Sequence, residues 1–315
     1  MIVSNNIIDL CDDKTIARLL VPDPLDESIP AEHRKAFEAV REEARALLET
    51  IVPQRLEGTY SKIFKKRKSG LQTESVVHQF FVNKDVGATN ITTDKDATFS
   101  FTPVESTIDV DAGQRFVFNA KNVTVRLGIP VESTNGVLDT VNCLVDAFKE
   151  KRETEAADVL NKATTYNPTI GGDGMPLSSL SHPHDKGVWS NTFYHQMDLN
   201  RESLETALKQ IETSWFDVSG KQISANGVRL VVPPKLKKIA ARLDFPHVAW
   251  GHMKNAYWWF VQTDIDGLIW YERIPFNLAV GIEKGTNKPF LVGNERRVFT
   301  YTDPHAVFCA TPSDS

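Results

Sequence analysis

The segment Arg229-Leu230-Val231-Val232-Pro233-Pro234-Lys235-Leu236 passes from an apolar run into a pair of prolines. Apart from Arg229 the run is apolar and β-branched or leucine, which predicts a buried strand. Proline has no backbone N–H and a fixed φ, so it ends a strand but suits the first turn of a helix. We therefore expect a helix to start at Pro234. Its expected apolar face consists of Leu236, Ile239, Ala240 and Leu243.

Strands and helices alternate on both sides of this junction. Upstream, Asn200 is a suitable N-cap for a helix with an apolar stripe. That stripe consists of Leu204, Ala207, Leu208, Ile211 and Trp215. The expected downstream strands are Tyr257 to Val261, Leu268 to Tyr271 and Val298 to Tyr301, which are rich in aromatic and β-branched residues. The sequence therefore predicts a mixed fold of the α+β class.

The longest periodic segment runs from Val137 to Ala163, after the possible N-caps Ser133, Thr134 and Asn135. Its apolar stripe consists of Val137, Val141, Leu144, Val145, Phe148, Ala156, Val159 and Leu160. The opposite face, from Lys149 to Glu155, is strongly charged and is expected to face solvent. Cys143 falls near the stripe, so we expect it to be a core thiol. Such a long helix is expected to form a backbone across the subunit.

The N-terminal part has a different character. Residues 1–30 contain short apolar runs and several prolines, which is typical of an extended arm. A helix is predicted from Ala31 to Thr50, closed by Pro53, with Phe37, Val40, Ala44, Leu47 and Leu48 on one face. Alternating residues between positions 58 and 131 predict strands. The polar stretch Asn83 to Lys95 suits a projecting β-hairpin.

Composition limits the possible functions. The chain has 315 residues, a formal net charge of −5 and 41% hydrophobic residues, which fits a globular protein but not one whose main work is to wrap nucleic acid. Its three cysteines, Cys11, Cys143 and Cys309, are far apart and suggest neither a disulfide framework nor a zinc site. The sequence has neither a visible signal peptide nor an apolar stretch of about 18 residues. We expect a soluble protein in a reducing cytoplasm.

One cluster resembles a metal site. His182-Pro183-His184-Asp185, with His195 further on, contains the ligand types of zinc or non-haem iron. The spacing argues against a site, because ligands two residues apart converge only on an extended segment and no second half such as HExxH is present. A surface loop is the better interpretation. The glycine-rich stretch Gly171 to Gly174 follows a helix and fits no phosphate-binding frame, so it is read as a turn.

No catalytic constellation emerges from the rest of the chain. The carboxylate pairs Glu42-Glu43 and Asp264/Asp266 fall on predicted solvated surface and turns, and no GxSxG elbow is present. The sequence therefore predicts no catalytic, metal-binding or cofactor-binding residues. The one dense basic run is Lys62, Lys65, Lys66, Arg67 and Lys68, interleaved with Tyr60 and Phe64. Contact with DNA is conceivable there, but a solvated face or an acidic patch on a neighbour is the favoured interpretation.

Several motifs resemble, in the same order, the major head subunit family of Mu-like phages. The stretches Asp173 to Leu177 and Ser181 to Pro183 resemble its DG-x-PLF…HP pattern, and Arg229 to Ala240 resembles its LVVPP-x-L…A junction. The other matching stretches are Leu199 to Ala207, Asp217 to Lys221, Asn255 to Trp258, Tyr271 to Pro275 and Asp303 to Val307. The sequence departs from the pattern at Ser178-Ser179-Leu180, where relatives often carry an aromatic residue. The resemblance covers roughly Gly136 to Phe308.

This resemblance implies a Hong Kong 97-type capsid fold and the function of a major capsid protein. The implied divisions are an N-terminal arm and helix (1–57), an extended β-hairpin loop region (58–112), a peripheral domain with a spine helix (113–170), an axial domain (171–290), and a return strand of the peripheral domain with the C-terminus (291–315). The implied partners are further copies in hexamers and pentamers, a separate scaffolding protein, a portal, a decoration protein and packaged double-stranded DNA through non-specific contacts. The expected location is the virion capsid, assembled in the host cytoplasm, without membrane contact. Lys84 and Lys95 lie in the hairpin, but nothing identifies a partner for an isopeptide crosslink, so none is predicted.

Two other functions remain open from the sequence. A metal-dependent hydrolase using His182, His184 and Asp185 predicts bound metal in a monomer or small oligomer. Another self-assembling virion component, such as a tail-tube or decoration protein, predicts self-association without the long spine helix.

Overall fold

The structure is a computed structural model that describes most of the chain from Ala31 to Pro312. The described ranges are 31–50, 52–68, 76–81, 89–93, 99–103, 113–118, 121–128, 136–165, 170–171, 173–184, 187–216, 222, 227–255, 257–262, 267–282, 289–301 and 303–312. Several predictions fall outside these ranges: the arm of residues 1–30, the caps Ser133 to Asn135, and Cys11, Lys84, Lys95, Asp185, Asp264 and Asp266.

The chain forms two compact units, each built from separate segments. Unit 1 comprises residues 1–58, 120–152 and 272–297, and unit 2 comprises residues 59–119, 153–271 and 298–315. The helix α4 (Gly136–Asn161) and the strands β13 (Leu268–Ile282) and β14 (Pro289–Tyr301) each contribute residues to both units.

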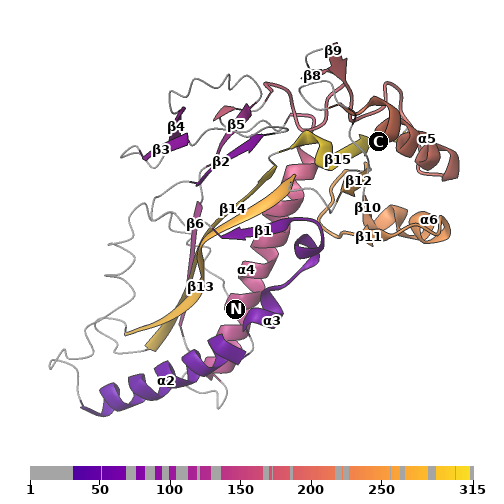
Figure 1. The fold of residues 1–315 in the computed structure, drawn as a ribbon. Helices are drawn as coiled ribbons and strands as arrows, with labels where there is room; N and C mark the ends of the chain where they lie inside the picture. Colours follow the sequence, from indigo (N-terminus) through magenta and orange to yellow (C-terminus); the bar gives the residue numbers. More distant parts are fainter. Residues whose placement is uncertain are drawn as a thin grey trace. The chain divides into compact units, whose positions relative to one another are not determined.

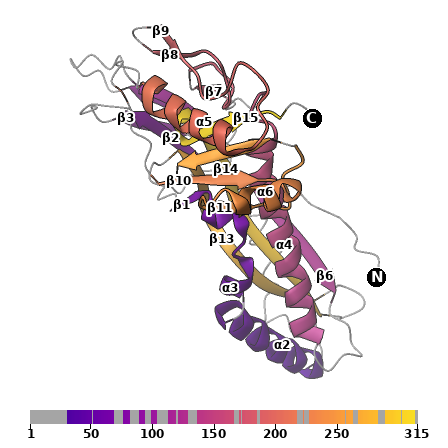
Figure 2. The same ribbon diagram turned by 90° about the vertical axis from the view of Figure 1, so that its right-hand side faces the viewer.

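Unit 1 has an apolar core between helices and a sheet (Figures 1 and 2). The helix α2 (Ala31–Thr50) has the predicted bounds, and Val40, Ala44, Leu47 and Leu48 of its predicted face pack into this core. Pro53 does not simply close the segment, because it lies in the first turn of a short helix, α3 (Val52–Leu56). Val137, Val141, Leu144, Val145 and Phe148 of α4 complete the core together with Phe276, Val280 and Leu291.

The helix α4 confirms the predicted long element and corrects two details. All eight residues of the predicted stripe are buried, because apolar residues three and four positions apart lie on one side of a helix. Cys143 is exposed, so the prediction of a core thiol was wrong. The charged face was also predicted wrongly in part, since Arg152 and Glu153 are buried and both have side-chain partners.

The buried Arg152 belongs to a charged triad within unit 1. Its Nε lies 3.0 Å from Oε2 of Glu295, and Oε1 of Glu295 lies 2.6 Å from Nε of Arg297. All three side chains are at most 5% exposed. The carboxylate of Glu295 therefore pairs with two buried guanidinium groups, each of which is costly to bury without a partner.

The buried Glu153 has a comparable role within unit 2. Oε2 accepts a hydrogen bond of 2.6 Å from Nε1 of Trp250, and Oε1 accepts one from the backbone N–H of Thr59. Near the end of α4, Asn161 donates to the carbonyl of His252 and accepts from the backbone N–H of Lys254. These bonds fix the segment 250–255 against the second part of α4.

The largest strands form a sheet in the order β1-β13-β14-β6, where β1 is Lys65–Lys68 and β6 is Lys121–Gly128. β14 pairs antiparallel with β6 in a register from Phe290–Gly128 to Arg297–Lys121. β13 and β14 are far longer than the predicted strands, because the polar and charged residues between their apolar ends also pair within the sheet. The basic run Lys65 to Lys68 is thus an edge strand.

Shorter strands follow the predicted β region. β2 (Val76–Phe81), β5 (Gly113–Phe118) and β7 (Ile170–Gly171) form a sheet in that order. β3 (Thr89–Thr93) pairs antiparallel with β4 (Phe99–Pro103), so the predicted hairpin stretch Asn83 to Lys95 contains one strand of an antiparallel pair. The remainder of that stretch lies outside the described residues.

A second four-stranded sheet lies in unit 2, with the order β11-β10-β12-β15. β10 (Val228–Val232) is the predicted strand of the junction, followed by the 3₁₀ turn η2 (Pro234–Leu236) and helix α6 (Lys237–Arg242). The other strands are β11 (His247–Ala249), β12 (Trp258–Gln262) and β15 (Val307–Ala310). β12, which corresponds to the predicted strand Tyr257 to Val261, pairs antiparallel with both β10 and β15.

Two helices cover one core beside this sheet (Figure 1). Helix α5 (Arg201–Ser214) has the predicted cap, because the side chain of Asn200 accepts from the N–H of Ser203 and Ser203 reciprocates. α5 contributes Leu204, Ala207 and Ile211, and α6 contributes Ala240 with Leu236 and Leu243 partly buried. Ile239 is 38% exposed, so its predicted place on the apolar face was wrong.

The remaining short elements of unit 2 are η1 (Thr59–Lys62), β8 (His182–His184), β9 (Gly187–Trp189) and η3 (Pro304–Ala306). In the part of the chain that the structure describes, none of the helices is both long enough and apolar enough to cross a membrane.

Candidate functional site

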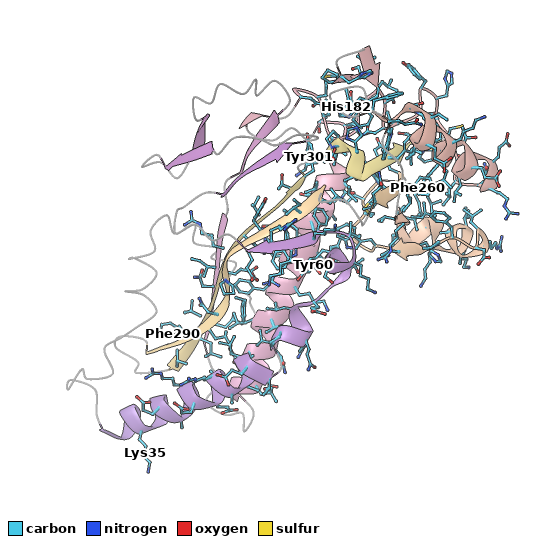
Figure 3. The ribbon with its side chains drawn as sticks, viewed as in Figure 1. Lys35, Tyr60, His182, Phe260, Phe290 and Tyr301 are labelled. Carbon is cyan, nitrogen blue, oxygen red and sulfur yellow. The ribbon has the colours of Figure 1, made fainter. Side chains whose placement is uncertain are left out.

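The histidine segment singled out in the sequence is a strand and not a surface loop. His182 and His184 lie on β8, which pairs antiparallel with β9 through His182–Trp189 and His184–Gly187. His182 is 0% exposed, so the surface-loop interpretation was wrong for this residue. Figure 3 shows His182 in unit 2, and His195 is exposed.

His182 is held by the turn that precedes it. Its Nδ1 lies 2.6 Å from Oδ2 of Asp173, and the other carboxylate oxygen accepts a hydrogen bond from the N–H of Met175. Gly174, between Asp173 and Met175, has a φ of 78°, which suits glycine far better than other residues. Asp173 and Gly174 therefore form a tight turn, and the carboxylate of Asp173 orients the buried His182.

Aromatic rings extend this arrangement into a stack. The ring of Trp189 lies between two imidazoles, with centroids 4.6 Å from His182 and 3.8 Å from His305. Both contacts are close to parallel, with interplanar angles of 24° and 10°. Trp215 meets His305 and Trp189 at steep angles, which is the favoured edge-to-face geometry.

His305 is anchored at both nitrogens. Nδ1 lies 2.6 Å from Oδ1 of Asp303, and Nε2 lies 2.9 Å from the carbonyl oxygen of Phe216. Two histidine–aspartate pairs therefore enclose one tryptophan. The contact with Phe216 ties His305 to a segment 89 positions away in the sequence.

A buried amide completes the cluster. Asn191 is fully buried and donates to the carbonyls of Leu177 and Pro304 at 2.6 and 3.1 Å, while its Oδ1 accepts from the N–H of Ser179. Each bond ends on the backbone of another segment. The side chain of Asn191, just after β9, thus connects the stretch Leu177 to Ser179 with the segment at Pro304 that precedes β15.

The cluster has few of the features that catalysis requires. Among the described residues, no three His, Cys, Asp or Glu side chains are grouped so that they could hold a metal ion. Nδ1 of His182 is engaged with Asp173, while its buried Nε2 has no hydrogen-bond partner in the described part of the structure. Burial raises the pKa of the nearby Cys309 thiol far above its ordinary value, against a smaller opposing hydrogen bond with Ser178, so this thiol is a poor nucleophile.

The basic run lies elsewhere in unit 2, beside an aromatic group. Nζ of Lys66 lies 4.8 Å from the ring centroid of Trp270, which is a cation–π contact. Tyr60, labelled in Figure 3, packs edge-on against Trp270 and Phe299. The two aromatic residues interleaved with the basic run, Tyr60 and Phe64, are therefore buried in a ring cluster and are not available to stack on bases.

Sequence reasoning found half of this cluster. Asp173, His182 and the Asp303 to Val307 stretch were noticed as motif positions, but nothing in their spacing indicated that the two histidines share one tryptophan. Asn191 and Trp189 were not predicted to have a role, and Trp215 was expected only in the apolar stripe of the helix after Asn200. The available signal was the concentration of polar residues around isolated tryptophans in this part of the chain.

Comparisons with known proteins give a fold and no family. Neither protein-family profiles nor curated protein sequences contain a match to this chain. Among solved structures, the virus-like particle from Pyrococcus furiosus matches with a TM-score of 0.50 and 12% identity, over 87% of this chain and 99% of that chain. The capsid of a native GTA particle matches with a TM-score of 0.50 and 11% identity, over 81% and 91%. The chain therefore has a mixed helix-and-sheet fold that is shared with these capsid-type proteins.

Proposed function

We propose that this chain is the major capsid protein of a tailed bacteriophage, which self-assembles into the icosahedral head that encloses the genome. The observation that carries the proposal is the shared fold, which extends over more than four fifths of this chain and nearly the whole of two particle proteins. The ordered series of motifs that resembles Mu-like head subunits supports the same function independently of the fold.

The proposal includes a Hong Kong 97-type division of the chain. Residues 1–57 form the arm and first helix, 58–112 the extended loop region, 113–170 the peripheral domain with its spine helix, 171–290 the axial domain and 291–315 the return strand. The unbroken helix α4 and the antiparallel β3–β4 pair support this division.

In such a shell the subunit acts by tiling. Each contact between two copies buries a modest area, and the closed shell is stable because every copy makes many such contacts at once. The partners are other copies in hexamers and pentamers, a scaffolding protein, a portal, a decoration protein and packaged DNA through non-specific contacts. The subunit has no catalytic role, and the His182–Trp189–His305 cluster holds its own segments together.

Electron microscopy of negatively stained, purified protein tests this function. The protein is expressed alone and together with the product of the neighbouring gene, and the same preparation from cells without the gene serves as the control for host particles. We expect closed shells, or hexameric and pentameric rings. A persistent monomer that carries one zinc ion per chain would refute the proposal and favour the hydrolase.

A further inference from the structure

The outward face of α6 is strongly basic. Lys235, Lys238, Ile239 and Arg242 are spaced i, i+3, i+4 and i+7, which places them on one side of the η2–α6 segment. All four are exposed, as is Lys237 beside them. We call these five residues the α6 face. Its buried counterpart is the stripe of Leu236, Ala240 and Leu243, so the segment has a core side and a free side.

The cations of this face are not neutralised locally. There is no acidic residue between Val232 and Leu243, and within the described part of the chain none of the four cations forms an ion pair. The whole chain, in contrast, has a net charge of −5. An exposed isoleucine surrounded by four cations has the composition of an interface with an apolar centre and a charged rim.

The outward face of α5 has mixed charges with a small excess of carboxylates. Its exposed carboxylates are Glu202, Glu205 and Glu212, and its exposed cations are Arg201 and Lys209. Arg201 lies 3.6 Å from Glu205, but both side chains are more than two thirds exposed, so this pair is weak. We call these five residues the α5 face, which carries three negative and two positive charges.

The two faces belong to the same compact unit. α5 and α6 pack against the same core with Leu230, Val232, Trp258 and Phe260 of the sheet, within unit 2. Figure 1 shows both helices on the same side of β10 and β12. A body that carries two different complementary surfaces is suited to a head-to-tail contact, in which the same pair of surfaces is repeated around a ring.

We propose that the α6 face of one copy binds the α5 face of the next copy within a ring of subunits. This inference rests on the proposed capsid function and names the surfaces that form its rings. Ile239 is the apolar centre of the contact, and the lysines and arginine pair with the carboxylates of α5. Charge complementarity of this kind selects the correct partner and its orientation.

A charge-swap experiment on the full chain tests the contact. The first variant reverses the charge of two residues on α6 (Lys238→Glu and Arg242→Glu). The second variant keeps these changes and also reverses the charge of two residues on α5 (Glu202→Lys and Glu205→Lys). A variant that exchanges the cations (Lys238→Arg and Arg242→Lys) keeps the charge and is the matched control. Far-ultraviolet circular dichroism and the unfolding midpoint establish that each variant is folded.

The readout is the protein concentration at which half of the chains are assembled. Charge reversal on α6 alone is expected to raise this concentration by about tenfold or more. For the double swap and for the matched control, the concentration is expected to lie within about threefold of the wild-type value. A folded α6 reversal that assembles like the wild type overturns the inference. It is also overturned if the double swap fails to restore assembly and the α6 reversal no longer binds duplex DNA. The α6 face would then be a surface that binds nucleic acid. Failure of the wild type itself to assemble would instead refute the proposed function.

Discussion

At the residue scale, polar side chains that are fully buried determine which segments of unit 2 lie together. Asn191 illustrates this, because its amide bonds to a carbonyl and an N–H of the stretch Leu177 to Ser179 and to the carbonyl of Pro304, which is 113 positions away. A buried backbone group that loses its partner cannot turn to water instead. The sequence position of Asn191, in a stretch of polar residues, gave no indication of this role.

Asn191→Ala tests that role directly. Removal of the amide takes their partner from the carbonyl of Leu177 and the N–H of Ser179, whereas the carbonyl of Pro304 keeps the N–H of Val307, so we expect the free energy of unfolding to fall by about 2 to 3 kcal/mol. Urea denaturation followed by tryptophan fluorescence measures the change. Thr206→Ala is the control, because its exposed hydroxyl bonds only to the preceding turn of α5. Equal effects of the two substitutions would contradict the account.

At the element scale, close packing of α4 against β13 and β14 within unit 1 depends on a glycine. A Cβ at Gly293 of β14 would lie 2.7 Å from the Phe148 ring of α4 and 3.0 Å from the Phe276 ring of β13. Those two rings also pack edge-to-face with centroids 4.8 Å apart. The absence of a side chain at Gly293 therefore allows the helix and the two strands to share one aromatic contact.

Gly293→Ala is expected to lower the free energy of unfolding by about 1 to 3 kcal/mol, because the added methyl group displaces two packed rings. Gly251→Ala is the matched control, since a Cβ there would meet no atom within 4 Å. Thermal denaturation compares the two variants with the wild type. If Gly293→Ala melts at the same temperature as Gly251→Ala, the rings move aside freely and the packing argument fails.

The charged triad is a second device at this scale. Glu295→Ala leaves Arg152 and Arg297 buried without their shared carboxylate, so we expect a loss of about 3 to 5 kcal/mol in stability. Glu49→Ala removes an exposed carboxylate that pairs with Arg45 on α2 and is expected to cost less than about 0.5 kcal/mol. Chemical denaturation of both variants distinguishes the two cases. A similar cost for both substitutions would mean that the guanidinium groups reach water once the carboxylate is gone.

At the scale of the whole molecule, the proposed function makes a prediction about concentration. A shell held by many weak contacts forms only above a threshold, because few contacts are satisfied until a ring closes. We expect light scattering from purified protein, or from protein mixed with its scaffold, to stay low up to a critical concentration and then rise steeply. Gradual growth of mass in proportion to concentration would indicate open chains of subunits, which a closed capsid does not form.

Hydrophobic periodicity and capping residues predicted helices and strands correctly where one side of the element is buried along its length. The stripe of α4, the capped helix α5 and the strand that ends at Pro233-Pro234 were all predicted from the sequence and are present in the structure. The mixed fold shared with capsid-type proteins was expected from the motifs and agrees with the comparisons. The stripe, the helix cap and the end of the strand depend on residues within a few turns of one another, so the sequence alone determined them.

Only the tertiary structure shows which residues differ in burial from what the periodic pattern predicts. Cys143 and Ile239 are exposed although the pattern assigned them to an apolar side, and Arg152 is buried, where it pairs with Glu295, 143 positions away. His182 and His305 share Trp189, and the three come together only when β9 and the chain before β15 have both folded. A periodic pattern predicts which residues share a face of a helix or strand. Segments far away along the chain decide whether that face is buried and whether its charged residues have partners.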